Sequence, residues 1–157
     1  MIRPFTSYLT AFLALFCLTG CAEFSQEARM DTAQGIYFSA HMARVNVNTP
    51  AFPIALFERV NYAGQEVTVY IEGEARGSIN TFTAKVNPTP NDPIALKMAA
   101  ADKSKNIIYI APPCAYFSQA TLDTCDPEFF TTRRFSDEVL ASYGQVLQKY
   151  RDLYDIK

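Results

Sequence analysis

Residues 106–111 (NIIYIA) constrain the fold more than any other part of the sequence. A short, continuous run of β-branched and aromatic residues is typical of a strand buried on both faces, as in a parallel sheet. A parallel strand needs a crossover, and residues 92–102 supply one, with Asp92 placed to cap a helix and Pro93 at its first position. Residues 66–72 (EVTVYIE) supply the preceding strand. The sequence therefore predicts a right-handed strand–helix–strand unit.

The flanking segments extend this unit into an α/β domain. Residues 43–47 and 52–60 are rich in β-formers around an Asn-Thr-Pro break, which predicts an antiparallel pair at one edge of the sheet. Asp31 and Thr32 are placed to cap a short helix. Ser136 is placed to cap a final helix, because apolar residues recur after it at intervals of three and four. These residues are Val139, Leu140, Tyr143, Val146, Leu147, Tyr150, Leu153 and Tyr154.

The first twenty residues have the organisation of a secretory signal. Arg3 precedes an apolar run (LTAFLALFCL) that is too short for a stable transmembrane span. The run ends in Leu-Thr-Gly-Cys, and this ending resembles the lipobox of bacterial lipoproteins. The resemblance implies that residues 1–20 are removed and that Cys21 is acylated and attaches the protein to a bilayer. An ordinary cleaved signal with an incidental Cys21, or an uncleaved anchor, is the alternative.

This interpretation divides the chain into a signal peptide (1–20), a lipidated N-terminus and tether (21–30) and one domain (31–157). It predicts an exported, membrane-anchored protein that faces the periplasm or the cell exterior. Ala22 favours the outer membrane, since lipoproteins held at the inner membrane often have Asp there. The net charge of −2 and the pI near 5.4 argue against nucleic-acid binding, which normally needs a basic face.

Cysteine usage agrees with export. Cys17 lies in the signal and Cys21 at the lipid site, which leaves Cys114 and Cys125, eleven positions apart. An even pair in an exported chain favours a disulfide over the alternatives, a metal pair or a redox pair. The spacing is not Cys-x-x-Cys, and the only histidine, His41, is far away in the sequence. We therefore expect neither a metal nor a cofactor.

Four segments, in order, resemble the N-terminal half of a group of exported α/β-hydrolases: VTVYIEGEARG, NPTPNDPIALKMAAAD, NIIYIAPPCAY and CDPEFFTTRRFSDEVLASY. The resemblance covers roughly residues 60–150. It implies a partial α/β-hydrolase fold, in which the third strand lies between the fourth and the fifth, and ester or acyl hydrolysis in intact relatives. It also implies an oxyanion loop at Gly73, Glu74 and Ala75. Gly73 suits a sharp turn, and Ala75 stands where relatives tend to have Gly.

The catalytic triad of that family is absent from this sequence. The family needs a nucleophilic Ser in Gly-x-Ser-x-Gly, followed later by an acid and a His. No such motif occurs, and His41 precedes all the predicted strands and is expected at a helix end or on the surface. Ser78, Ser118, Ser136 and Ser142 are expected in loops, at caps and on helix surfaces. We therefore assign no catalytic residue.

Two functional hypotheses follow from the sequence. In the first, the chain is a lipoprotein related to α/β-hydrolases that is inactive alone, because it ends before the nucleophile strand. The apolar edge of residues 66–72 would then pair with a complementing C-terminal hydrolase half or with a second copy. In the second, the chain is a non-enzymatic envelope lipoprotein. It would bind a ligand or partner through residues 73–90 or through the aromatic loop at Tyr116 and Phe117.

Overall fold

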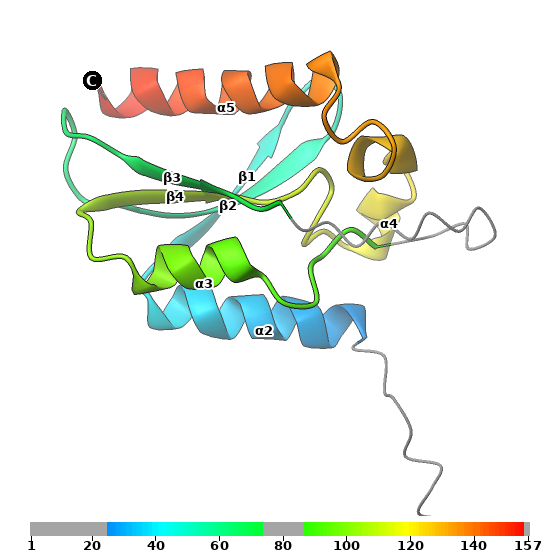
Figure 1. Cartoon of the computed structure of the whole chain (residues 1–157), viewed down its shortest axis with the longest axis horizontal. Helices are drawn as coiled ribbons and strands as arrows, with labels where there is room; N and C mark the ends of the chain where they lie inside the picture. Colours follow the sequence, from blue (N-terminus) through cyan, green and yellow to red (C-terminus); the bar gives the residue numbers. More distant parts are fainter. Residues whose placement is uncertain (1–24, 74–86, 156–157) are drawn as a thin grey trace, which may run out of the picture.

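The computed structural model describes residues 25–73 and 87–155. Within them a four-stranded mixed sheet lies between helices on both of its faces (Figure 1). The elements are α2 (Gln26–Ser39), β1 (Ala43–Asn48), β2 (Pro53–Val60), β3 (Thr68–Ile71), α3 (Ile94–Ala101), β4 (Asn106–Ile110), α4 (Gln119–Leu122), a 3-10 turn η1 (Pro127–Phe130) and α5 (Asp137–Tyr154). The predictions for Cys21, Glu74, Ala75 and Ser78 lie outside the described residues. None of the helices in the described ranges has the length and apolar character needed to cross a membrane.

The sheet has the strand order β1-β2-β4-β3. β2 pairs antiparallel with both β1 and β4, and β3 pairs parallel with β4, so that Val69 lies opposite Ile108 and Ile71 opposite Ile110. This confirms an α/β domain with an antiparallel pair at one edge. The parallel pair forms the other edge of the described sheet rather than its interior.

Two apolar cores lie on opposite faces of the sheet, because side chains alternate along each strand. Ala55, Phe57, Ile107 and Tyr109 point to the face that carries α2 and α3. The face that carries α5 receives Ile54, Leu56, Ile108 and Ile110. In the first core Phe57 stacks between Tyr37 and Tyr109, with ring centroids 4.4 and 5.5 Å away. β2 and β4 are thus the centre of the domain.

Helix α2 begins earlier than the sequence predicts. Its cap is Ser25, whose hydroxyl accepts a hydrogen bond from the Ala28 N–H at 3.1 Å, so the predicted cap at Asp31 and Thr32 is wrong. Residues 26–30, expected to belong to a tether, form the first turns of this helix, and Arg29 is buried. The sequence did not predict this start because residues 22–30 are polar and lack a periodic apolar pattern. The buried residues of α2 are Arg29 and Ala33.

Helix α3 is capped from another element. Its N-cap position is Pro93 and has no side-chain cap of its own, while Asp92 pairs with Lys97 instead. The Ala95 N–H donates to the Glu72 carboxylate at 3.2 Å, so the residue after β3 satisfies the start of α3. The predicted cap at Asp92 is therefore wrong.

Helix α5 follows the prediction at its start and along most of its buried face. Ser136 caps it through the Val139 N–H, and Val139, Val146 and Tyr150 are buried. Leu140 and Leu153 were predicted on the same face but are exposed. Ser142, predicted on the helix surface, is buried and bonds to the Thr49 hydroxyl at 3.2 Å. That partner precedes it by 93 positions, so local spacing could not reveal it.

Candidate functional site

Polar groups converge where β3 and β4 end, which is the edge at which open α/β sheets usually bind ligands. Glu72 follows β3 directly, and its N–H donates to the Ile110 carbonyl at 3.0 Å. Its side chain is only 7% exposed, and one carboxylate oxygen accepts from the Ala95 N–H at the start of α3. Glu72 thus joins the end of β3 to the start of α3.

Two buried tyrosines extend this cluster from β4 into the loop that follows it. The Tyr109 hydroxyl donates to Glu72 at 3.4 Å and lies 3.5 Å from the Tyr116 hydroxyl. Burial raises the pKa of Tyr109 well above its usual range, and Tyr116 and Glu72 act in the same direction. Tyr109 therefore stays protonated at neutral pH, and its hydroxyl acts as a hydrogen-bond donor to Glu72.

The loop after β4 holds two residues in a conformation that favours glycine. Cys114 has φ of 62° and Tyr116 has φ of 66°. Non-glycine residues cost about 1 kcal/mol or more each in this region, and such residues concentrate at functional sites. The Cys114 N–H bonds to the Pro53 carbonyl at 3.1 Å, and the Tyr116 N–H bonds to the buried Thr89 hydroxyl at 2.9 Å. These contacts fix the loop against β2 and the segment before α3.

A disulfide and two side chains close the same loop. Cys114 and Cys125 are bonded, with Cα atoms 6.5 Å apart, which confirms the predicted disulfide. A loop of this size contributes on the order of 3 kcal/mol through the entropy of the unfolded chain. The Arg44 guanidinium donates to the Tyr116 carbonyl, and the Gln26 amide donates to the Phe117 carbonyl at 2.8 Å. The start of α2 is therefore attached to the carboxyl edge of the sheet.

The oxyanion-loop prediction rests on Gly73 alone within the described residues. Gly73 is exposed and does not adopt a positive φ, and an added Cβ would meet no atom within 4 Å. Glu74 and Ala75 lie outside the described residues, so the oxyanion loop stays a prediction. The glycine that needs its conformational freedom is Gly64, with φ of 73° in the turn before β3.

The other singled-out residues have structural roles. His41 is exposed just after α2, which confirms its place at a helix end. Ser118 and Ser136 cap α4 and α5. Arg133, which precedes α5, pairs with Glu128 and Glu138. None of these residues lies in the cluster formed by Glu72, Tyr109 and Tyr116.

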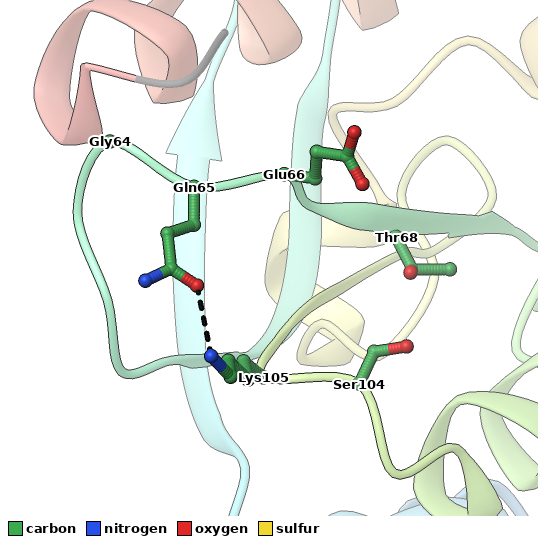
Figure 2. A pocket seen from close by; sticks show the side chains of 6 residues that line it. All are labelled: Gly64, Gln65, Glu66, Thr68, Ser104 and Lys105. Carbon is green, nitrogen blue, oxygen red and sulfur yellow. Dashed lines mark hydrogen bonds between the residues drawn. The ribbon is translucent and has the colours of Figure 1, made fainter.

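The edge of the sheet at which β3 and β4 begin differs from the edge that holds Glu72, Tyr109 and Tyr116. A hollow of about 540 Å³ lies there. It is lined by Gly64, Gln65, Glu66, Thr68, Ser104 and Lys105, which Figure 2 labels. Lys105 reaches Gln65 at 3.4 Å, while Glu66 points away from both. The lining side chains are exposed or half-buried surface groups without a buried polar partner at their centre. The hollow therefore lacks the fixed donors or acceptors that ligand sites use for orientation.

The sequence alone did not identify the Glu72 cluster. In the sequence Glu72 is the last residue of a predicted strand, Tyr109 is one residue of an apolar run, and Tyr116 belongs to a predicted binding loop. Only the spatial order of β3 and β4 brings them together. Among the described residues no group of three or more His, Cys, Asp or Glu side chains could hold a metal ion. Comparisons with family models, with curated proteins and with solved structures found no match to this chain.

Proposed function

We propose that this chain is an exported lipoprotein, anchored through Cys21, whose domain corresponds to the first half of an α/β-hydrolase sheet. By itself it does not hydrolyse esters, because none of its residues forms Gly-x-Ser-x-Gly. It acts through the outer edge of β3, which has no partner strand among the described residues and takes one from a complementing polypeptide. The observation that carries the proposal is the strand order β1-β2-β4-β3 together with that free edge.

The positions of α3 and α5 support the hydrolase-like arrangement. α3 connects β3 to β4 over one face of the sheet, and α5 follows β4 over the opposite face (Figure 1). Parallel crossovers are right-handed in nearly all proteins. A parallel strand that follows α5 on that opposite face must therefore lie beyond β3, which is where the resemblance puts the fifth strand. The Tyr154 carbonyl at the end of α5 accepts from Gly64 at 2.8 Å, just before β3 begins.

The free edge of β3 offers both backbone and side-chain partners. Within the described residues β3 pairs only with β4. Glu72 donates to β4, and residues of a parallel pair alternate in the side to which their backbone groups point. The N–H and C=O groups of Val69 and Ile71 therefore point outward, where an added strand can bind them. Their side chains are 36% and 48% exposed on the α5 face, and an added strand with apolar side chains would cover them.

The second hypothesis, a non-enzymatic envelope lipoprotein, proposes two binding surfaces, and one of them is buried. The aromatic loop was expected to present Tyr116 and Phe117 to a partner. Tyr116 is 1% exposed and Phe117 is 9% exposed, so both rings belong to the core beneath α2. The other surface, residues 73–90, lies mostly outside the described residues. The β3 edge is therefore the better-supported binding surface.

The absence of catalysis is tested on the mature, disulfide-bonded chain. We expect no turnover of p-nitrophenyl esters and no covalent labelling by a fluorophosphonate probe. A serine labelled at a stoichiometry near one would contradict the proposal. Labelling of a denatured sample provides the background.

The anchor and the strand partner are tested separately. Metabolic labelling with an alkyne fatty acid should mark the wild type and not Cys21→Ser, and equal labelling of both would overturn the lipoprotein assignment. For the edge, Ile71→Lys should abolish capture of a complementing hydrolase half, whereas Leu153→Lys on the outer surface of α5 should not. A concentration-dependent dimer that is lost in Ile71→Lys would instead assign the edge to a second copy.

A further inference from the structure

We infer that the carboxyl edge of the sheet, with the Glu72 cluster and the loop after β4, faces the bilayer to which the chain is anchored. The inference rests on the proposed acylation of Cys21 and adds an orientation to it. The partner is the lipid surface itself. The position of α2 and the length of the tether support this orientation.

The start of α2 is fixed at the carboxyl edge. Ser25 caps the helix, and Gln26 bonds to the Phe117 carbonyl in the loop after β4. Figure 1 shows the start of α2 at the same end of the molecule as α4 and the start of α5. The end of α2 lies at the opposite edge, where Arg59 donates to the Ala40 carbonyl at 2.8 Å and to the Asp102 carbonyl at 2.7 Å.

The chain between the anchor and α2 is short. Four peptide units separate Cys21 from Ser25, and even when fully extended they span only about 14 Å. Helix α2 has 14 residues and is therefore about 21 Å long. The carboxyl edge lies within reach of the headgroups for any conformation of the tether. The hollow at the amino edge (Figure 2) lies a helix length farther along the domain.

One side chain exposed at the carboxyl edge can enter a lipid interface. Phe135, just before α5, is 72% exposed, and the Arg134 guanidinium lies 4.8 Å from its ring centroid. An exposed aromatic ring beside a long cationic side chain is typical of groups that insert at the headgroup level. The amino edge carries a similar pair, Tyr62 and Lys105, and the carboxyl edge also exposes acidic side chains. The orientation is therefore inferred from the position of α2 and the length of the tether.

Depth-dependent quenching tests the orientation. In the mature chain Cys114 and Cys125 are bonded and Cys21 is acylated, so a single introduced cysteine can be labelled. Thr132→Cys places a bimane label at the carboxyl edge and Gln65→Cys places one at the amino edge. The acylated proteins are reconstituted into phosphatidylcholine vesicles that contain brominated lipid. We expect the label at position 132 to be quenched several times more strongly than the label at position 65.

A longer tether provides the matched control. Inserting twenty Gly and Ser residues between Cys21 and Ser25 should keep acylation and reduce the difference between the two labels. Equal quenching at both positions of the unmodified chain, or stronger quenching at position 65, would overturn the inferred orientation while leaving the anchor intact. A difference that persists with the long tether would contradict the tether as its cause. Failure of Cys21 to take up fatty acid would overturn the proposed anchor and this orientation with it.

Discussion

β3 and β4 are neighbouring parallel strands of similar composition, but their surroundings differ. All five residues of β4 are buried, whereas Val69 and Ile71 of β3 are exposed on the α5 face. β4 has a strand on each side, β2 and β3, and a packed core on each face. β3 has a strand on one side only within the described residues. Apolar composition therefore does not mark a buried strand by itself, and an apolar strand with a free edge marks a place for a partner.

The largest expected difference in stability is between alanine substitutions of two isoleucines that lie opposite each other. Ile110→Ala in β4 should lower the free energy of unfolding by about 4 kcal/mol, because it leaves a cavity in a filled core. Ile71→Ala in β3 should cost less than about 1 kcal/mol, because its side chain is 48% exposed. Urea unfolding of the two variants measures both values. Equal losses would mean that the α5 face of β3 is already covered in the isolated chain.

A second comparison concerns the turn that leads into β3. The buried Asn106 accepts from the Asn61 and Tyr62 N–H groups, both at 3.0 Å, and donates to the Tyr62 carbonyl at 2.7 Å. Asn106→Leu leaves these groups without partners and should cost about 3 kcal/mol. Asn61→Ala is the matched control, since its exposed amide makes one bond of 3.3 Å, to Lys105. The control should cost less than about 0.5 kcal/mol in the same unfolding experiment. Equal costs would contradict the role given to Asn106.

Tyr70 and Tyr109 lie opposite each other in β3 and β4. A third, smaller difference concerns the pKa values of their hydroxyl groups. A hydrogen bond to Asp102, 2.9 Å long, raises the pKa of Tyr70, whereas burial raises the pKa of Tyr109. Asp102→Asn should therefore lower the pKa of Tyr70 toward 10.0 and leave Tyr109 unchanged. The chain has nine tyrosines, so the ¹³Cζ chemical shift of each ring, measured by NMR during alkaline titration, follows these two separately. Titration of both tyrosines together in the folded protein would contradict the burial of Tyr109.

The raised pKa of Tyr109 also makes the stability of the domain depend on pH. The folded state holds the Tyr109 proton more tightly than the unfolded state, in which the pKa is near 10.0. Its contribution is complete below that value and is lost as the pH rises toward the pKa of the folded state. Stability should therefore fall as the pH rises above about 10. Chemical unfolding over this range measures the loss, and a flat profile would contradict it.

Local sequence signals found the elements that depend on local chemistry. The β-rich runs and the Asn-Thr-Pro break gave β1 and β2, the apolar run gave β4, and Ser136 gave the start of α5. The start of α2, capped locally by Ser25, was missed, and the other main misses involve distant partners. Glu72 caps α3 across 23 positions, and Ser142 is buried by its contact with Thr49. The Glu72 cluster could not be predicted for the same reason, because strand order rather than spacing brings its members together.

Amide hydrogen exchange along β3 tests the open edge most directly. In the isolated monomeric chain, the N–H groups of Tyr70 and Glu72 face β4, whereas those of Val69 and Ile71 face outward. We predict alternating protection, with exchange at Val69 and Ile71 at least about tenfold faster than at Tyr70 and Glu72, since an unbonded exposed amide needs no opening. A complementing strand should then protect Val69 and Ile71. Uniform slow exchange at all four amides in the monomer would contradict a free β3 edge and, with it, the proposed function.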